Sequence, residues 1–258
     1  MDEGTTQQFY IATKSAPPDD RTRVLKYGHM FAVFDRYGDV ETTGLGEEGI
    51  FYQGTRFLSE LALFLGNSRP LLLSSTVRED NSLFTADLTN VDLLENQQVH
   101  IPRGTLHITR SKFLYQHACY EKLKICVYSL QPIKTTLGLK FNADYADIFE
   151  VRGIRRTRRG QTAAPVIDGS IVTLAYQGLD GVRRCTKIAF TPTPQRITSR
   201  DCRFDINLAS HEEMVIEVVV TFELQGNSNG TIAYDRALAS SIDETRIAGG
   251  DLCLRPSN

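Results

Sequence analysis

The sequence predicts an all-β fold: a large antiparallel β-sandwich of two packed sheets, followed by a C-terminal connector helix. Three observations favour this class. Short runs rich in β-branched and aromatic residues recur along the chain. Turn-forming segments separate these runs at short intervals. The length of 258 residues suits one large sandwich, since such domains commonly reach roughly 200–250 residues as a single unit.

The expected strands start with FAVFD and finish with VIEVVVTFEL. Between these two lie ELALFL, LHITRSKFLY, EKLKICVYSL, TLGLKF, IVTLAY and CTKIAF. Gly66-Asn67 and Asp180-Gly181 are the clearest hairpin signals, because glycine, asparagine and aspartate tolerate the backbone angles of tight turns. Neighbouring strands should therefore be antiparallel.

We expect three parts in the chain. Residues 1–23, which include APPDDR, form a polar tail or edge segment, and residues 24–225 form the sandwich. Residues 226–258 hold the linker GNSNG and a helix that leads toward a helical catalytic domain outside this sequence. The apolar residues of that helix recur at roughly helical spacing: Ile232, Leu238, Ile242 and Ile247. A helix folded back on the sandwich is physically as favourable as a connector.

Composition argues against several kinds of partner. Lysine and arginine total 29 against 31 for aspartate and glutamate, so no global field favours nucleic acid or an anionic membrane. The start, MDEGTTQQFY, lacks the pattern of a secretory signal, and no apolar run approaches the roughly 20 residues that span a bilayer. The cysteines have no zinc-like spacing and indicate reduced thiols in a cytoplasmic protein: Cys119, Cys126, Cys185, Cys202 and Cys253.

Several short motifs match catalytic or binding patterns but lack the neighbouring residues or elements that these patterns need. GLGEEG (44–49) fits a dinucleotide-binding pattern, but Glu47 and Glu48 would repel phosphate, and a strand rather than a helix follows. GNSNG fits a nucleophile elbow, yet the last histidine, His211, precedes Ser228, so the usual order of a triad fails. The other histidines are scattered and show no metal-binding spacing: His29, His100, His107 and His117. We expect no cofactor and no metal.

The segment ADYADIFEVRGIRRTRRG (143–160) places three carboxylates ahead of five arginines. Asn142 can cap a short turn in which Tyr145, Ile148 and Phe149 share an apolar side. Asp144 and Asp147 would then lie roughly 5–6 Å apart, which overlaps the separation of about 5–5.5 Å in retaining glycosidases. The spacing alone does not exclude catalysis, but glycosidase carboxylates flank the scissile bond from two sides, whereas two groups on one turn point the same way. Because arginine and carboxylate pair strongly, we expect a brace or an interface. The residues concerned are Asp144, Asp147, Glu150, Arg152, Arg155, Arg156, Arg158 and Arg159.

The chain resembles a known family. The segments that show the resemblance are, in chain order, VLKYGHMFAVFDRYGDV, GIFYQGTRFLSELAL, RPLLLSS, DLTN, DYADIFEVRGIRRTRRG, YQGLDGVRR and TPTP. They resemble the N-terminal domain of glycogen debranching enzymes of the amylo-α-1,6-glucosidase type, over about residues 24–225. The family usually has aspartate before its threonine-arginine pair, whereas Gly54 precedes Thr55 and Arg56 here. The resemblance implies a sandwich followed by a barrel of paired helices that carries the catalytic carboxylates.

The leading functional expectation is a non-catalytic domain that packs on the helical barrel and supports or borders its substrate cleft. The interface or cleft candidates are Arg56, Asp144, Asp147, Glu150, Arg152 and Arg155. A second hypothesis is an independent α-glucan-binding module, although the chain has no tryptophan for sugar stacking. A third is a sandwich enzyme that acts on carbohydrate through Asp144, Asp147 or Glu150. Neither a nucleic acid nor a membrane is an expected partner.

Overall fold

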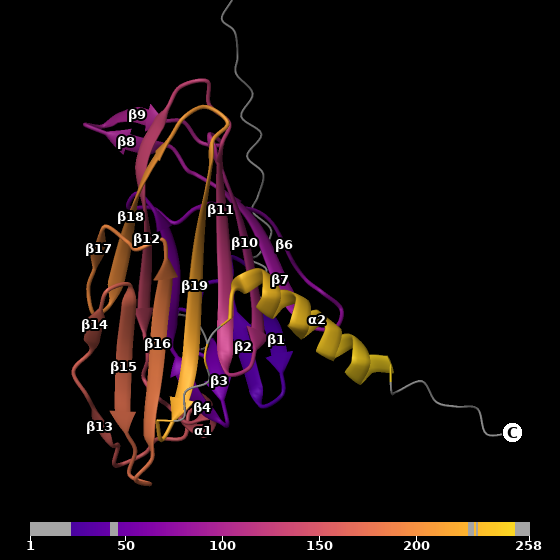
Figure 1. Cartoon of the computed structure of the whole chain (residues 1–258). Helices are drawn as coiled ribbons and strands as arrows, with labels where there is room; N and C mark the ends of the chain where they lie inside the picture. The colour runs from indigo at the N-terminus through magenta and orange to yellow at the C-terminus, as the bar shows by residue number, and fades with distance from the viewer. Residues whose placement is uncertain (1–21, 42–45, 227–229, 231, 251–258) are drawn as a thin grey trace, which may run out of the picture.

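The computed structural model describes residues 22–41, 46–226, 230 and 232–250, and most of these residues lie in strands. A large sheet forms one layer, and two four-stranded sheets pack against its inner face (Figure 1). Every pairing between the named strands is antiparallel. The predicted antiparallel β-sandwich is confirmed.

The large sheet has the order β13-β15-β16-β19-β11-β10-β7-β6, and β14 pairs with β15 beside this path. Its long central strands alternate apolar and polar residues, so that one face enters the core. The strands are β6 (Leu71–Val77), β7 (Leu83–Thr89), β10 (Leu106–Tyr115), β11 (Ala118–Val127), β13 (Gln161–Thr162), β14 (Val166–Asp168), β15 (Ile171–Gln177), β16 (Arg183–Thr191) and β19 (Glu213–Leu224).

Three smaller sheets complete the described strands. The first has the order β1-β2-β3-β4, with β1 (Arg23–Tyr27), β2 (Met30–Phe34), β3 (Gly49–Tyr52) and β4 (Thr55–Leu58). The second has the order β17-β18-β12-β5, with β5 (Glu60–Leu65), β12 (Ile133–Asn142), β17 (Arg196–Ile197) and β18 (Asp201–Leu208). The third is the hairpin of β8 (Leu93–Glu95) and β9 (Gln98–Ile101).

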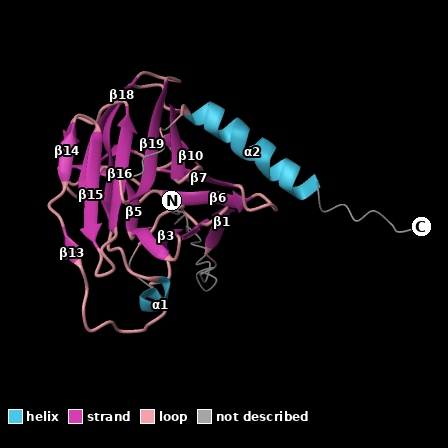
Figure 2. Ribbon diagram, turned by 60° about the horizontal axis from the view of Figure 1, so that its bottom comes forward, coloured by secondary structure: helices cyan, strands magenta, loops and turns pink. Residues whose placement is uncertain are grey.

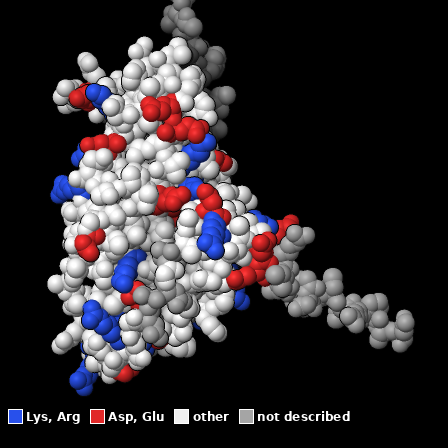
Figure 3. Space-filling model, in the orientation of Figure 1, with Lys and Arg blue, Asp and Glu red and all other residues white. Residues whose placement is uncertain are grey.

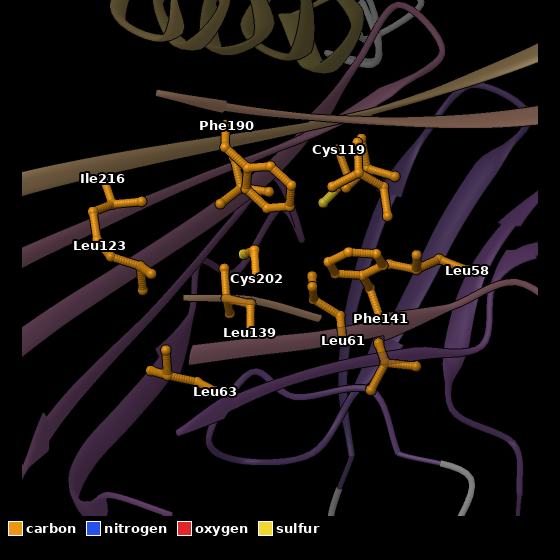
Figure 4. Close-up of a cluster of buried hydrophobic side chains, with 14 of the residues drawn as sticks. Leu58, Leu61, Leu63, Cys119, Leu123, Leu139, Phe141, Phe190, Cys202 and Ile216 are labelled. Atoms are coloured by element: carbon orange, nitrogen blue, oxygen red, sulfur yellow. The ribbon is translucent and has the colours of Figure 1, made fainter. Parts of the chain in front are cut away.

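A continuous apolar core fills the space between the layers (Figure 4). Phe141 of β12 and Phe190 of β16 face each other across it, with ring centroids 5.8 Å apart. Phe190 also meets Phe204 of β18 edge to face at 6.2 Å. The layers are therefore joined by direct ring contacts as well as by aliphatic packing.

Two helices lie outside the layers (Figure 2). The short α1 (Ile148–Val151) follows β12 at one end of the sandwich, and α2 (Tyr234–Gly250) starts on the outer face of the large sheet. Tyr234 packs edge to face on Phe113 at 5.0 Å, and its hydroxyl lies 2.7 Å from Ser111 Oγ. Glu244 accepts hydrogen bonds from the hydroxyls of Tyr27 and Tyr115. The predicted C-terminal helix is present, and its first turns bind the sandwich.

The two predicted turns have different outcomes. Asp180-Gly181 lies in the turn that joins the paired strands β15 and β16, as expected of a hairpin. Gly66-Asn67 forms a tight turn in which Leu65 and Ser68 bridge, but the chain then crosses to the large sheet. Strand β5 pairs with β12 rather than with β6. That hairpin prediction is wrong, because a turn signal reports only the reversal of the chain and not the sheet that the next strand joins.

Candidate functional site

The carboxylates of the segment 143–160 lie where β12 leaves its sheet and α1 begins. Asp147 is the N-terminal cap of α1: its Oδ1 accepts the N–H of Phe149 at 2.9 Å. Glu150 completes the capping box by accepting the N–H of Asp147 at 2.9 Å. Asn142 is the last residue of β12, and its side-chain oxygen accepts the N–H of Ala143 at 3.0 Å. The expectation that Asn142 caps this turn is wrong, because the strand extends through it.

The apolar side expected for this turn does not form either. Tyr145 is buried, stacks on Tyr176 with ring centroids 5.4 Å apart, and donates its hydroxyl to the Leu174 carbonyl at 2.8 Å. Burial raises the pKa of the Tyr145 hydroxyl above its usual range. Phe149 instead points outward with 57% of its surface exposed. The two rings separate because a positive φ of 51° at Tyr145 turns the chain before α1 starts.

Asp144 binds Arg56 of β4. Arg56 Nε donates to Oδ1 at 3.1 Å and Nη2 donates to Oδ2 at 2.5 Å, while Nη1 donates to the carbonyls of Gly46 and Glu48. The Arg56 side chain is 9% exposed. This two-point contact fixes the end of β12 to β4, and together with the two carbonyls it gives each nitrogen of the buried guanidinium a hydrogen-bond partner.

Asp147 and Glu150 bind arginines of the following loop. Arg156 lies 3.1 Å from Asp147 and 3.8 Å from Glu150, and Arg159 lies 3.5 Å from Glu150. Arg159 also donates to the carbonyl of Asp144 at 3.1 Å. These contacts fold the loop after α1 back over the helix, so that each of the three carboxylates cross-braces this end of the sandwich.

Three other arginines differ from Arg56, Arg156 and Arg159. Among the described residues, no side-chain hydrogen bond or ion pair is made by Arg152, Arg155 or Arg158. Large apolar side chains are exposed beside them, with 60% of Ile154 and 64% of Leu179 accessible. We call this patch the α1 surface. It consists of Phe149, Arg152, Ile154, Arg155, Arg158 and Leu179.

A cavity of ≈ 350 Å³ adjoins the α1 surface. Its lining includes Glu150, Arg158, Tyr176 and Leu179. Arg184 also lines it and binds Asp180 through two nitrogens, at 3.1 and 2.8 Å. The wall therefore combines aromatic rings with charged groups, most of which are already paired, whereas the Arg158 side chain is not.

Gly54 occupies the turn between β3 and β4. Gln53 and Gly54 have φ values of 47° and 76°, the positive pair that a two-residue hairpin turn needs. The Gly54 carbonyl accepts the N–H of Ile148 at 2.9 Å, and nothing lies within 4 Å of a Cβ built on Gly54. Glycine suits this backbone, and its carbonyl fixes the start of α1.

Sequence patterns did not reveal a buried ionic cluster between the layers. Arg110 and Lys112 of β10 share Glu121 of β11, with contacts of 2.6 and 2.7 Å. Arg110 also binds Asp39, which Arg69 contacts at 2.8 Å from the other side. Burial opposes ionisation of Asp39 and Glu121, but the surrounding cations and their hydrogen bonds, with Arg110 the largest contributor, together outweigh it and lower the pKa of both carboxyl groups. A signal existed, because Arg110 and Lys112 lie at inward positions of the strand LHITRSKFLY.

Among the described residues, the structure adds no catalytic or metal-binding group to the other motifs of the sequence. Gly44 of GLGEEG and Ser228 of GNSNG lie outside the described residues, and strand β3 starts at Gly49. Within the described ranges, no cluster of histidine, cysteine, aspartate and glutamate could hold a metal ion, and Cys119, Cys126, Cys185 and Cys202 are unpaired. No helix in those ranges is long and apolar enough to cross a membrane. On the face in Figure 3, positive and negative side chains are interspersed.

The fold and this end of the molecule define a class: a large two-layer antiparallel β-sandwich domain with a cross-braced, charged end. Solved structures share the fold. A protein described as a kojibiose phosphorylase from human microbiome has a TM-score of 0.55 and 12% identity, covering 89% of this chain and 34% of its own. The Slr1438 protein of Synechocystis sp. PCC 6803 has a TM-score of 0.50 and 11% identity, covering 84% and 99%. The chain thus spans about a third of the first structure's chain.

The family follows from sequence. The model of the N-terminal domain of some glycogen debranching enzymes matches residues 25–219, and the chain belongs to this family. No curated protein matches the sequence. The resemblance drawn from the sequence alone is confirmed.

Proposed function

We propose that this chain is the non-catalytic N-terminal β-sandwich of a glycogen debranching enzyme of the amylo-α-1,6-glucosidase type. Its α1 surface packs on a helical-barrel catalytic domain and borders that domain's substrate cleft. The composition of the α1 surface carries the proposal. Phe149, Ile154 and Leu179 are more than half exposed, and the unpaired Arg152 and Arg155 lie beside them. Aromatic residues and arginine are the types most enriched in protein interfaces.

The braced carboxylates support the non-catalytic role. Asp144 is held by Arg56, while Asp147 and Glu150 cap α1 and bind Arg156. A general acid or base needs a carboxyl group that can reach substrate and exchange a proton. Here the same groups hold α1 in place, which suits a rigid support for a neighbouring domain.

The proposal includes the domain boundaries and the compartment. Residues 24–225 form the sandwich, and residues 226–258 connect it to the catalytic domain. Helix α2 supports this role. Tyr234 contacts Ser111 and Glu244 contacts Tyr115, and these two contacts fix the direction of α2 on the large sheet. The unpaired state of the four described cysteines supports a reducing cytoplasm.

The test uses the complete protein that contains this sequence. The double variant Phe149→Ser/Ile154→Ser should lose most release of glucose from α-1,6-branched limit dextrin, because the sandwich no longer seats on the barrel. The same pair of changes in the 258-residue chain should leave its midpoint of thermal unfolding unchanged, since both side chains are exposed.

Leu73→Ser/Leu130→Ser is the matched control, because these leucines are 59% and 85% exposed and lie outside the α1 surface. The control should retain full activity. Equal activity of the two double variants would overturn the packing role. Glucose release by the 258-residue chain alone would overturn the non-catalytic role.

A further inference from the structure

We infer that the outer face of the four-stranded sheet β17-β18-β12-β5 carries a binding groove for an α-glucan chain, on the layer opposite the large sheet. The choice of α-glucan as the sugar class rests on the proposed function. The groove itself rests on the geometry of three neighbouring strands. It shares no lining residue with the α1 surface.

Phe64, Gly138 and Arg203 form one row across three strands. Gly138 of β12 pairs with Phe64 of β5 on one side and with Arg203 of β18 on the other. The neighbours of Gly138 in its strand, Leu137 and Leu139, are fully buried in the core, so this row faces outward. Adjacent strands lie about 4.8 Å apart, so a notch roughly 9–10 Å wide separates the phenyl ring from the guanidinium. A pyranose ring fits this width.

Gly138 keeps the notch open, although the backbone conformation at this position does not require glycine. It does not have a positive φ, and an added Cβ would meet only the Cys202 carbonyl at 3.6 Å and Phe64 Cβ at 4.0 Å, which are ordinary contacts. A larger residue would suit the strand better, since glycine weakens a strand interior. Glycine inside a strand commonly marks a bulge, a tight bend, or a site where a ligand or another backbone approaches closely, and the pairings of β12 show no register shift.

The notch opens into a longer groove. The hollow over Gly138 has a volume of ≈ 360 Å³ and the next hollow ≈ 740 Å³. Both are lined by Gly66, Asn67, Thr136 and Arg203, so the two hollows adjoin each other. The second runs to the β8–β9 hairpin, where Glu95 and His100 lie. The groove therefore has room for several linked sugar units.

The chemistry of the lining suits a neutral polyhydroxyl chain. Lys140, Arg203 and Lys134 supply donors, while Asp201, Asp92 and Glu95 supply acceptors, so the charges balance. A phosphorylated ligand would need an excess of positive charge, and an apolar peptide would need more apolar wall. Lys140 Nζ lies 4.6 Å from the centre of the Phe64 ring. A bound sugar displaces Lys140 from the face of the Phe64 ring, and the flexible lysine then donates hydrogen bonds to the sugar hydroxyls.

Titration calorimetry of the 258-residue chain with maltoheptaose tests the inference. The wild-type chain should release heat of binding, whereas Gly138→Val and Phe64→Leu should each bind at least about tenfold more weakly. Gly138→Val fills the notch, and its β-branched side chain should leave the urea midpoint unchanged or higher. Phe64→Leu keeps bulk but removes the flat ring, whereas Phe64→Tyr retains the ring and should retain binding.

Thr173→Val is the control off the groove, since Thr173 lies on β15 of the large sheet. It should bind as the wild type does. No heat from the wild-type chain, or binding by Gly138→Val and Phe64→Leu as tight as that of the wild type, would overturn the groove while leaving the packing role of the α1 surface untouched. Equally tight binding of cellohexaose would overturn the α-glucan assignment. If maltoheptaose binds as expected but Phe149→Ser/Ile154→Ser keeps full activity in the complete protein, the packing role fails and the groove stands.

Discussion

Arg56 and Asp144, which are 88 positions apart in sequence, form a two-point ion pair that ties strand β4 to the end of β12. Arg56 is nearly buried, whereas Asp144 is 28% exposed at its side chain. The same guanidinium donates to two carbonyls of the loop before β3. One arginine therefore holds three segments at the end of the sandwich that carries the α1 surface.

Asp144→Asn should lower the free energy of unfolding by about 2–3 kcal/mol, because the buried Arg56 loses its counter-charge. Urea unfolding followed by tyrosine fluorescence measures it, as the chain has no tryptophan. Arg155→Ala, on the same end but unpaired, should stay within about 0.5 kcal/mol of the wild type. Similar losses in both variants would contradict the special role of the pair.

Glu121→Gln should cost about 3–5 kcal/mol, since it leaves Arg110 and Lys112 buried with too little negative charge. Lys112→Met added to Glu121→Gln should recover part of this loss, because it removes one uncompensated charge. A double-mutant cycle in urea measures the coupling. Additive losses would show that Lys112 and Glu121 do not stabilise the fold as a pair. If Glu121→Gln alone does not fold, recovery of folding in the double variant gives the same answer.

Glu48 should make the fold less stable as the pH rises. Burial raises its pKa from 4.5 to about 7, with Asp35 adding to the effect. The folded state then binds more protons than the unfolded state between these values, so stability falls from pH 4.5 to 7 and levels off above. Glu48→Gln should be more stable than the wild type at pH 8 by about 1–2 kcal/mol after solvent screening. Urea midpoints at pH 5 and pH 8 measure this, and a constant difference would contradict it.

Tyr234→Ala should release α2 from the large sheet while the sandwich stays folded. The change removes the ring contact with Phe113 and the hydroxyl contact with Ser111. Amide hydrogen exchange in α2 should accelerate at least about tenfold, while exchange in β10 and β11 should change little. Ala239→Ser, at an exposed position of the same helix, should exchange as the wild type does. Unchanged protection of α2 in Tyr234→Ala would show that other contacts dock the helix.

The sequence by itself determined much of this molecule. Alternating apolar residues identified the long strands, since a half-buried strand must repeat every two residues. The C-terminal helix and the turn at Asp180-Gly181 were equally local signals. The segment 143–160 also indicated ion pairs between its own carboxylates and arginines, because these residues are close along the chain.

Only the tertiary structure decided which strands pair and what shares a surface. An alternating pattern says which residues lie on one face, but not that Gly66-Asn67 sends the chain to the other layer. Asp144, the acidic partner of Arg56, and Asp39, one acidic partner of Arg110, lie far away in sequence. The three residues Phe64, Gly138 and Arg203 are likewise distant from one another in sequence. Such contacts depend on the register between strands that are distant in sequence. Local periodicity does not encode that register, because it is set by the packing of the whole core.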